Sequence, residues 1–401
     1  MASPKLERTT THVGLGPLVR YFLYLGSLGF GGPVALAGFM HRDLVEKERW
    51  VSEEEYRLAM ALAQIMPGPL AAQLAIAIGY FRHGVLGATL VGLAFVVPSF
   101  VMVVGISMIY VRFGGLWWMQ AVFYGIGAAV IAIIGIAAYK LSRSTNKRDP
   151  LLWAIFAVLG LITVVAQAEL AEFFVIAGLI VLFARARPGR REALITGLGG
   201  AGVVAVIWLV EQWLMNVGIG GQHILAQLLL FFTKAGAFVF GSGLAIVPFL
   251  QQGVVQQFGW LNDHQFLDAV AVAMITPGPV VITVAFIGFL VAGLLGAIAA
   301  GLGIFLPVYV FTVVPAPWFS RNRDNAQLKA FVQGATAAAT GALSGAVVVL
   351  AVRAIYDVPT AIIALVTFAV LWRYKIPEPL VVLAAAVVGL IVSPLTRGAG
   401  G

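Results

Sequence analysis

Two Pro-Gly-Pro triplets interrupt apolar, helix-forming runs, and breaks of this kind expose backbone groups that can bind an anion. They are Pro67-Gly68-Pro69 and Pro277-Gly278-Pro279, the second preceded by Thr276. Proline lacks an N–H and clashes with the preceding turn, so each triplet ends one helix and begins another, with its last proline suited to the first helical position. Within a membrane-length apolar run, such backbone is tolerated only against protein or a water-filled cavity.

Glycine-rich stretches predict a second pair of breaks, at Gly29-Phe30-Gly31-Gly32-Pro33 and Phe240-Gly241-Ser242-Gly243. A helix N-terminus offers unpaired N–H groups and about half a positive charge. Glycine can also serve close helix packing alone, as in Gly341-x-x-x-Gly345. Because the breaks form two matching pairs, we favour a site near the membrane midplane. Its predicted substrate-binding residues are Gly31, Gly32, Pro33, Pro67, Gly68, Pro69, Lys234, Gly241, Ser242, Gly243, Thr276, Pro277, Gly278 and Pro279.

Lys234 is the cation expected to complete this site. It follows Phe231-Phe232-Thr233 in an apolar run, two turns before the Gly241 break. A charge at that depth is costly and by default functional. The alternative is that its long stem lets the ammonium reach the membrane interface. The second basic pair, Arg82-His83, is better read as an interface anchor.

Three carboxylates are candidates to carry protons: Glu46, Asp263 and Asp268. The residues around these carboxylates are better explained by a structural role than by proton transfer. Ser52 with Glu55 forms a predicted capping box that opens a helix, as Asn262 with Gln265 does later in the chain. We therefore expect a proton role for at most some of the three.

Composition places the chain in a membrane. Of its 401 residues, 61% are hydrophobic and 10% are charged, whereas soluble domains carry about 25% charged residues. The net charge of +8 lies in short basic runs between apolar spans, which is typical of membrane topology and not of nucleic-acid binding. No cleavable signal is expected at the polar N-terminus.

The sequence contains no motif that indicates an enzyme. Cysteine is absent, and the five histidines show no metal-ligand spacing. No Ser/His/Asp set or Walker-type phosphate loop is present, and the glycine motifs lie in apolar helices instead of following a strand. We predict no catalytic residues, no metal and no cofactor.

Apolar runs long enough to approach a bilayer crossing of roughly 20 residues predict an all-α polytopic membrane protein of about 13 segments. Some segments are short enough to be re-entrant, chiefly the closely spaced pairs 151–168 with 170–185 and 359–373 with 378–394. The predicted segments are 16–40, 56–80, 84–111, 115–139, 151–168, 170–185, 194–217, 224–250, 266–290, 293–316, 328–352, 359–373 and 378–394.

An internal repeat divides the chain. An offset of 210 carries Trp50 onto Trp260 and the first Pro-Gly-Pro onto the second, and an offset of 209 carries Pro98 onto Pro307 and Glu169 onto Glu378. An offset that links Trp, Pro-Gly-Pro and Glu and changes by only one residue along the chain indicates duplication. We predict an N-terminal half at 1–190, a linker span within 191–223 and a C-terminal half at 224–401.

Charge predicts the orientation, since loops rich in Lys and Arg face the cytoplasm. The linker span 194–217 then turns the second six-segment half upside down, which predicts an inverted repeat in the inner membrane. The N-terminus lies inside, the C-terminus outside, and loop 43–55 also falls outside despite its basic residues. The residues predicted to face the cytoplasm are Lys5, Arg8, Lys140, Arg143, Lys147, Arg148, Arg185, Arg187, Arg190, Arg191, Arg321, Arg323, Arg373 and Lys375.

Together these motifs resemble the chromate ion transporter family in its long, two-domain form. The matching features are Phe30–Pro33, Glu46–Trp50, Pro67–Pro69, Gly79–Gly87 and Pro98, with second-half counterparts at Phe240–Gly243, Trp260, Pro277–Pro279, Gly288–Gly296 and Pro307. The resemblance implies export of chromate, with sulfate as an isosteric competitor, driven by the proton motive force. It also implies a basic residue at the place of Lys234. Gln251–Gly259 departs from the pattern because it lacks the Glu and Arg of the first half.

Other functions remain open at this stage. Broken helices and basic residues also serve passive anion channels and lipid-phosphate flippases, the substrate could be another oxyanion, and a membrane scaffold would need no substrate. The expected partners are a chromate- or sulfate-type oxyanion and membrane lipids, with no nucleic acid. The oligomeric state stays open, a homodimer included.

Overall fold

The computed structural model describes residues 13–30, 32–114, 116–166, 171–186, 189–216, 223–239, 243–322, 325–374 and 376–398, and within these ranges it contains helices and no strand. The predicted all-α class is therefore confirmed. The helices of the first part are α1 (Leu15–Leu28), α2 (Gly32–Met40), the π-helix η1 (His41–Lys47), α3 (Glu53–Ile65), α4 (Leu70–Phe113), α5 (Trp117–Asn146), α6 (Pro150–Ala166), α7 (Ala171–Ala186) and α8 (Arg190–Asn216). Those that follow are α9 (Ile224–Ala237), η2 (Gly243–Ile246), α10 (Val247–Gln251), η3 (Gln252–Gln257), α11 (Asp263–Ile275), η4 (Val280–Ile282), α12 (Thr283–Val313), α13 (Ala316–Asn322), α14 (Ala326–Ala354), α15 (Val358–Arg373) and α16 (Glu378–Gly398).

Both Pro-Gly-Pro triplets break helices as predicted. The first separates α3 from α4 and the second separates α11 from η4. Pro69 and Pro279 stand one position earlier than expected: both are extended N-cap residues. The Pro69 carbonyl accepts the N–H of Gln73 at 3.1 Å, which is the bond that defines an N-cap.

The same local backbone recurs at the predicted offset. His83 and Gly84 have φ/ψ of −139°/24° and 61°/−152°, and Ala292 and Gly293, 209 residues later, have −144°/30° and 61°/−150°. These residues interrupt α4 and α12 by a sharp kink, so that each comprises a short helix followed by a long one. Both predicted capping boxes, at Ser52 and Asn262, are also present.

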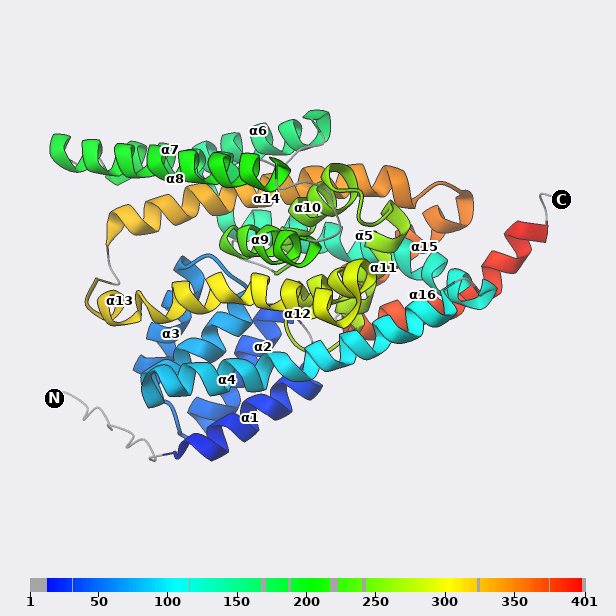
Figure 1. Ribbon diagram of the computed structural model, residues 1–401, viewed down its shortest axis with the longest axis horizontal. Coiled ribbons are helices and arrows are strands. Elements are labelled where there is room, and N and C mark those ends of the chain that lie inside the picture. The colour runs from blue at the N-terminus through cyan, green and yellow to red at the C-terminus, as the bar shows by residue number, and fades with distance from the viewer. Residues whose placement is uncertain are drawn as a thin grey trace.

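Late helices of each half pack against a long helix of the other. In Figure 1, α6 and α7 lie beside α14, and α16 lies along α5; α15 also contacts α5. Small residues allow these approaches, because a Cβ at Gly341 or Gly345 would meet the backbone of α6 at Phe156 or Gly160. The Gly341-x-x-x-Gly345 motif is therefore a packing surface, as the simpler interpretation held.

Within the described part of the chain, four helices are long and apolar enough to cross a membrane: Leu70–Phe113, Trp117–Asn146, Val280–Arg321 and Ala326–Ala354. They form two pairs at the repeat offset. The apolar helices Pro150–Val165, Ile224–Ala237, Val358–Arg373 and Glu378–Ser393 are shorter. The structure thus supports a helical membrane protein, while the layout of 13 segments in inverted orientation remains a prediction.

The broken segments consist of helices that are each too short to cross a membrane alone. Helices α1, α2, α3 and α11 have 14, 9, 13 and 13 residues, at most about 21 Å against roughly 30 Å of hydrocarbon. Loop 43–55 and Arg321 were placed on opposite sides, yet Leu44, Val51 and Phe319 share one buried cluster.

Candidate functional site

The four breaks converge, and the halves exchange a pair of equivalent backbone hydrogen bonds there. The N–H of Gly68 donates to the carbonyl of Val239 at 2.6 Å, and the N–H of Gly278 donates to the carbonyl of Gly29 at 3.1 Å. Val239 lies 210 residues after Gly29, and Gly278 lies 210 after Gly68, so each triplet rests on the glycine-rich break of the other half. Of the predicted residues, Gly31, Gly241 and Ser242 lie outside the described ranges.

Backbone geometry at the triplets requires glycine. Gly68 and Gly278 have φ of +148° and +99°, where an L side chain is strained. A Cβ at Gly278 would also overlap the hydroxyl of Ser99, and one at Gly68 would lie 2.6 Å from the Gln73 amide. These two N–H groups are already used between the halves, and the Thr283 N–H at the start of α12 bonds to carbonyls of η4, which leaves the first-turn N–H groups of α4, η4 and α2 to face a ligand.

Two polar residues of this region were missed from the sequence. Gln73 is fully buried, its amide nitrogen donates to the Pro67 carbonyl at 2.8 Å, and its Oε1 has no hydrogen-bond partner among the described residues. Ser99 is also fully buried and donates to the Gly26 carbonyl at 3.3 Å. A lone polar residue within an apolar span is the signal that would have found both.

The remaining predicted binding residues take different positions. The Thr276 hydroxyl donates to the Val272 carbonyl at 2.5 Å, so it turns toward its own helix. Gly32, with φ +73°, begins α2 and Pro33 follows it, as the predicted helix start requires. Gly243 begins η2 and is buried.

Lys234 lies in the last turn of α9, half-buried. Its ammonium is 5.4 Å from the centre of the Phe249 ring, close enough for a cation–π contact. The carboxylate of Glu172, in the first turn of α7, acts on it electrostatically. The charge is therefore held against α10 and α7 inside the protein, which weakens the interpretation of a lysine that merely reaches the interface.

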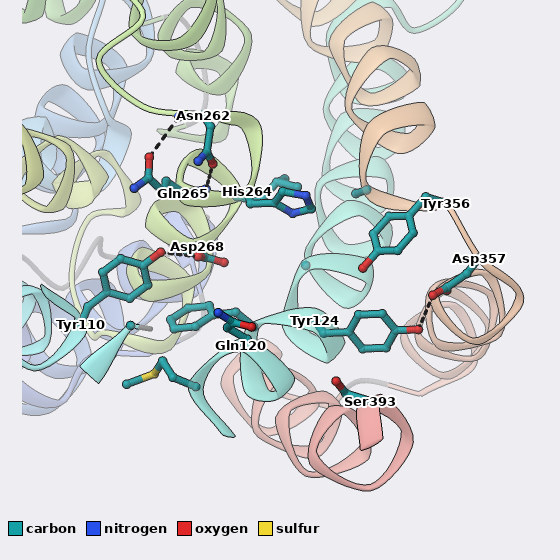
Figure 2. Close-up of a pocket in the computed structure, with 16 residues that line it drawn as sticks. Tyr110, Gln120, Tyr124, Asn262, His264, Gln265, Asp268, Tyr356, Asp357 and Ser393 are labelled. Atoms are coloured by element: carbon teal, nitrogen blue, oxygen red, sulfur yellow. Dashed lines mark hydrogen bonds between the residues drawn. The ribbon is translucent and has the colours of Figure 1, made fainter. Parts of the chain in front are cut away.

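A pocket of about 690 Å³ lies between α4, α5, α11 and the segment 354–357, and we call it the Tyr110 pocket. Figure 2 shows the Tyr110 hydroxyl bound to Asp268 and the Tyr124 hydroxyl bound to Asp357, at 2.7 and 2.6 Å. Asp268 is 9% exposed and precedes Thr276 by eight residues of α11, roughly 12 Å. A buried carboxylate beside a polar cavity and near the breaks is well placed to carry a proton.

Asp357 differs from Asp268 because it caps a helix. Burial raises the pKa of its carboxyl, but hydrogen bonds from the side chain and backbone of Thr360 and from Tyr124 outweigh burial and hold that pKa below its usual value. Asp357 is therefore an anion at neutral pH, and its charge contributes to the wall of the Tyr110 pocket.

The other two proton-carrier candidates lie on the surface. Glu46 is exposed and pairs with His41 at 3.2 Å, while the other ring nitrogen of His41 lies 2.8 Å from Glu53 and lowers the pKa of that carboxyl. Asp263 begins α11 and pairs with Arg353 at 2.6 Å. Glu46 lies in η1 and Asp263 at the start of α11, and each is engaged in an ion pair.

A second polar pocket, about 290 Å³, is lined by Gln64 of α3, the end of α5, Asp149, Leu152, Arg185 and residues Val332, Gln333 and Thr336 of α14. We call it the Asn146 pocket. It is the repeat counterpart of the Tyr110 pocket, since an offset of 209 carries its lining residues Thr145 and Lys147 onto Ala354 and Tyr356 of the other.

The two pockets lie at opposite ends of α5 and α14. Gln120 lines one pocket and Asn146 the other, 26 helical residues or about 39 Å apart. Helix α14 begins at the Asn146 pocket, with Gln333, and ends at the Tyr110 pocket, with Ala354. The repeat-related helices α5 and α14 therefore run in opposite directions between the same two pockets.

Membrane-length helices surrounding paired broken helices define a polytopic helical membrane protein. The sequence profile of chromate transporters matches residues 17–215 and 226–390, and the chain accordingly belongs to the chromate transporter family, as the motifs suggested.

Three relatives that match along nearly the full length are named as chromate transport proteins or as a probable one. The chain is 55% identical to the chromate transport protein of Cupriavidus metallidurans, over 95% of this chain and 94% of that protein. It is 52% identical to a probable chromate transport protein of Synechococcus elongatus, over 94% and 95%, and 31% identical to the chromate transport protein of Pseudomonas aeruginosa, over 93% and 91%. No solved structure matches the chain.

Proposed function

We propose that this protein exports chromate from the cytoplasm as a secondary active transporter driven by the proton motive force. The observation that carries the proposal is the exchange of equivalent hydrogen bonds between Gly68 and Val239 and between Gly278 and Gly29. This exchange gathers four helix breaks at one place, the arrangement in which transporters hold a substrate near the midplane. The family and the printed names of the relatives support an oxyanion as substrate.

A tetrahedral dianion can leave water only if fixed dipoles and a cation replace its hydration. The first-turn N–H groups at the starts of α2, α4 and η4 supply the dipoles, and Lys234 supplies the charge in our proposal. The unpartnered Oε1 of Gln73 is an acceptor and suits a hydroxyl hydrogen of a protonated oxyanion or a water that accompanies it.

If the halves are inverted, one site can be exposed to either side in turn by rocking one half against the other. The opposite directions of α5 and α14 between the two pockets support the inverted repeat. The basic loop at residues 140–148 supports a cytoplasmic position for the Asn146 pocket and hence an inner-membrane protein with a cytoplasmic N-terminus.

The proposed orientation predicts that cysteines introduced near the C-terminal ends of α5 and α14 differ in their reaction with a reagent outside the cell. We expect Ser144→Cys to resist an impermeant thiol reagent added outside intact cells, and Tyr356→Cys to react, since both side chains are exposed but at opposite pockets. The absence of native cysteine makes each readout unambiguous. Permeabilised cells should label both. Equal labelling of the two from outside would contradict the inverted arrangement.

Energy coupling separates this proposal from a passive anion channel. In everted vesicles, labelled chromate should accumulate during respiration, and an uncoupler should abolish the accumulation. We expect Asp268→Asn to lower accumulation to the uncoupled level while downhill exchange persists, because the buried carboxylate beside Tyr110 would carry the proton. Glu54→Gln, which removes an exposed carboxylate, is the matched control. Uptake that survives the uncoupler and runs only downhill would indicate a channel.

A further inference from the structure

We infer that the Asn146 pocket is a second oxyanion-binding site, which holds the anion at the cytoplasmic end of α5 before it reaches the broken helices. Its place on the transport route depends on the proposed function, whereas anion binding by the pocket does not. The site is separate from the converged breaks, although Gln64 of its lining stands three residues before Pro67.

Asn146 is the observation that points to a ligand. It is 0% exposed, and neither amide atom has a hydrogen-bond partner among the described residues. Leaving a buried amide without a partner is energetically unfavourable, so such groups usually meet a bound molecule or water. The repeat counterpart of Asn146 is Ile355, which shows that an apolar side chain occupies this place in the other half. An amide here is therefore not demanded by the fold.

The side chains that line the pocket carry a net positive charge, which favours an anion as the ligand. Lys147 and Arg185 line it together with one acid, Asp149. Arg185 pairs with Asp149, and the other oxygen of that carboxylate accepts the N–H groups of Leu151 and Leu152 at 3.0 and 3.3 Å. The acid is thus engaged in capping α6 and in its ion pair, and the charge of Lys147 remains in excess. The Tyr110 pocket, in contrast, carries Asp268 and Asp357.

The backbone at Lys147 is strained. Its φ of +46° is in the left-handed region, which a non-glycine residue adopts only where the surroundings impose it. The indole N–H of Trp153 donates to the Lys147 carbonyl at 3.1 Å and fixes the turn. With a volume of about 290 Å³, against the roughly 30 Å³ that one water occupies in the liquid, the pocket has room for a hydrated tetrahedral oxyanion.

The test uses the purified full chain carrying Ser144→Cys, an exposed lining position of the pocket. Inorganic sulfate is the probe, because chromate would oxidise the thiol, and the reagent is an uncharged maleimide. We expect sulfate to slow labelling where chloride at equal ionic strength does not. Added to this protein, Asn146→Ile or Lys147→Gln should raise the sulfate concentration for half-protection about tenfold, the effect of one lost hydrogen bond to a charged group.

Controls separate the pocket from its surroundings. Arg143→Gln removes a positive charge from the same end of α5 but does not line the pocket, and it should leave protection unchanged. Lys234→Gln should also leave it unchanged, because that residue lies outside the lining set. Labelling that sulfate does not slow, or equal protection in the parent, Asn146→Ile and Lys147→Gln proteins, would overturn the inference. Lys147 is exposed, so its variant remains informative if Asn146→Ile does not fold.

The outcome is independent of the transport assay. Chromate accumulation in vesicles without sulfate protection of Ser144→Cys would remove the second site and leave the proposed function standing. Protection without accumulation would establish the anion site and contradict the proposed function.

Discussion

Gly278→Ala is expected to abolish chromate transport and to lower the melting temperature of the purified protein. The φ of +99° strains any L side chain by about 1–3 kcal/mol, and the added Cβ would overlap the Ser99 hydroxyl, an overpacking cost of similar size. The backbone strain and the overpacking together are comparable with the free energy of unfolding of a marginally stable protein. Moving the loop to relieve the overlap would break the bond from Gly278 to the Gly29 carbonyl. Thermal unfolding in detergent and flux per folded molecule measure the two effects.

Two comparisons make this result specific. Gly105→Ala, in the middle of α4 where a Cβ would meet nothing within 4 Å, should keep both stability and flux. Adding Ser99→Gly to Gly278→Ala removes the overlap but not the backbone strain, so it should restore part of the stability. A Gly278→Ala protein that melts and transports like the parent would show that the exchanged bonds between the halves do not hold the site.

Lys234→Gln is expected to lower the apparent affinity for chromate by about ten- to a hundredfold while folding is retained. The estimate follows from the roughly 1.5–3 kcal/mol that a hydrogen bond to a charged group contributes. Lys234 is half-buried and its ammonium lies over the Phe249 ring. Gln has a side chain of similar volume, so the substitution removes the charge and leaves little empty space. The concentration dependence of chromate uptake into everted vesicles gives the affinity.

Lys234→Arg keeps the positive charge and should retain more of the affinity than the neutral variant. Arg57→Gln removes an exposed cation paired with Glu53 and should behave as the parent. If Lys234→Gln inserts normally and exports chromate with unchanged concentration dependence, the lysine has no part in substrate binding and its contact with Phe249 is structural.

The amino-acid sequence by itself determined the helical membrane class, the positions of the Pro-Gly-Pro breaks and the offset between the halves. These features are local or periodic: a proline breaks the helix in which it stands, and a repeated unit adopts the same backbone twice, as at Gly84 and Gly293. Both capping boxes were predictable for the same reason, since four neighbouring residues form each of them.

Only the tertiary structure decided which residues meet. Tyr110 and Asp268 are 158 residues apart, and no pattern near either residue specifies the other. The count of spans stays a prediction for a related reason: hydropathy measures the length of an apolar run, and a pair of half-helices that turns back presents the same run as one crossing helix. The direction of the chain after α3 ends at Ile65 depends on the acceptor of the Gly68 N–H. That acceptor is the carbonyl of Val239, in the other half of the protein.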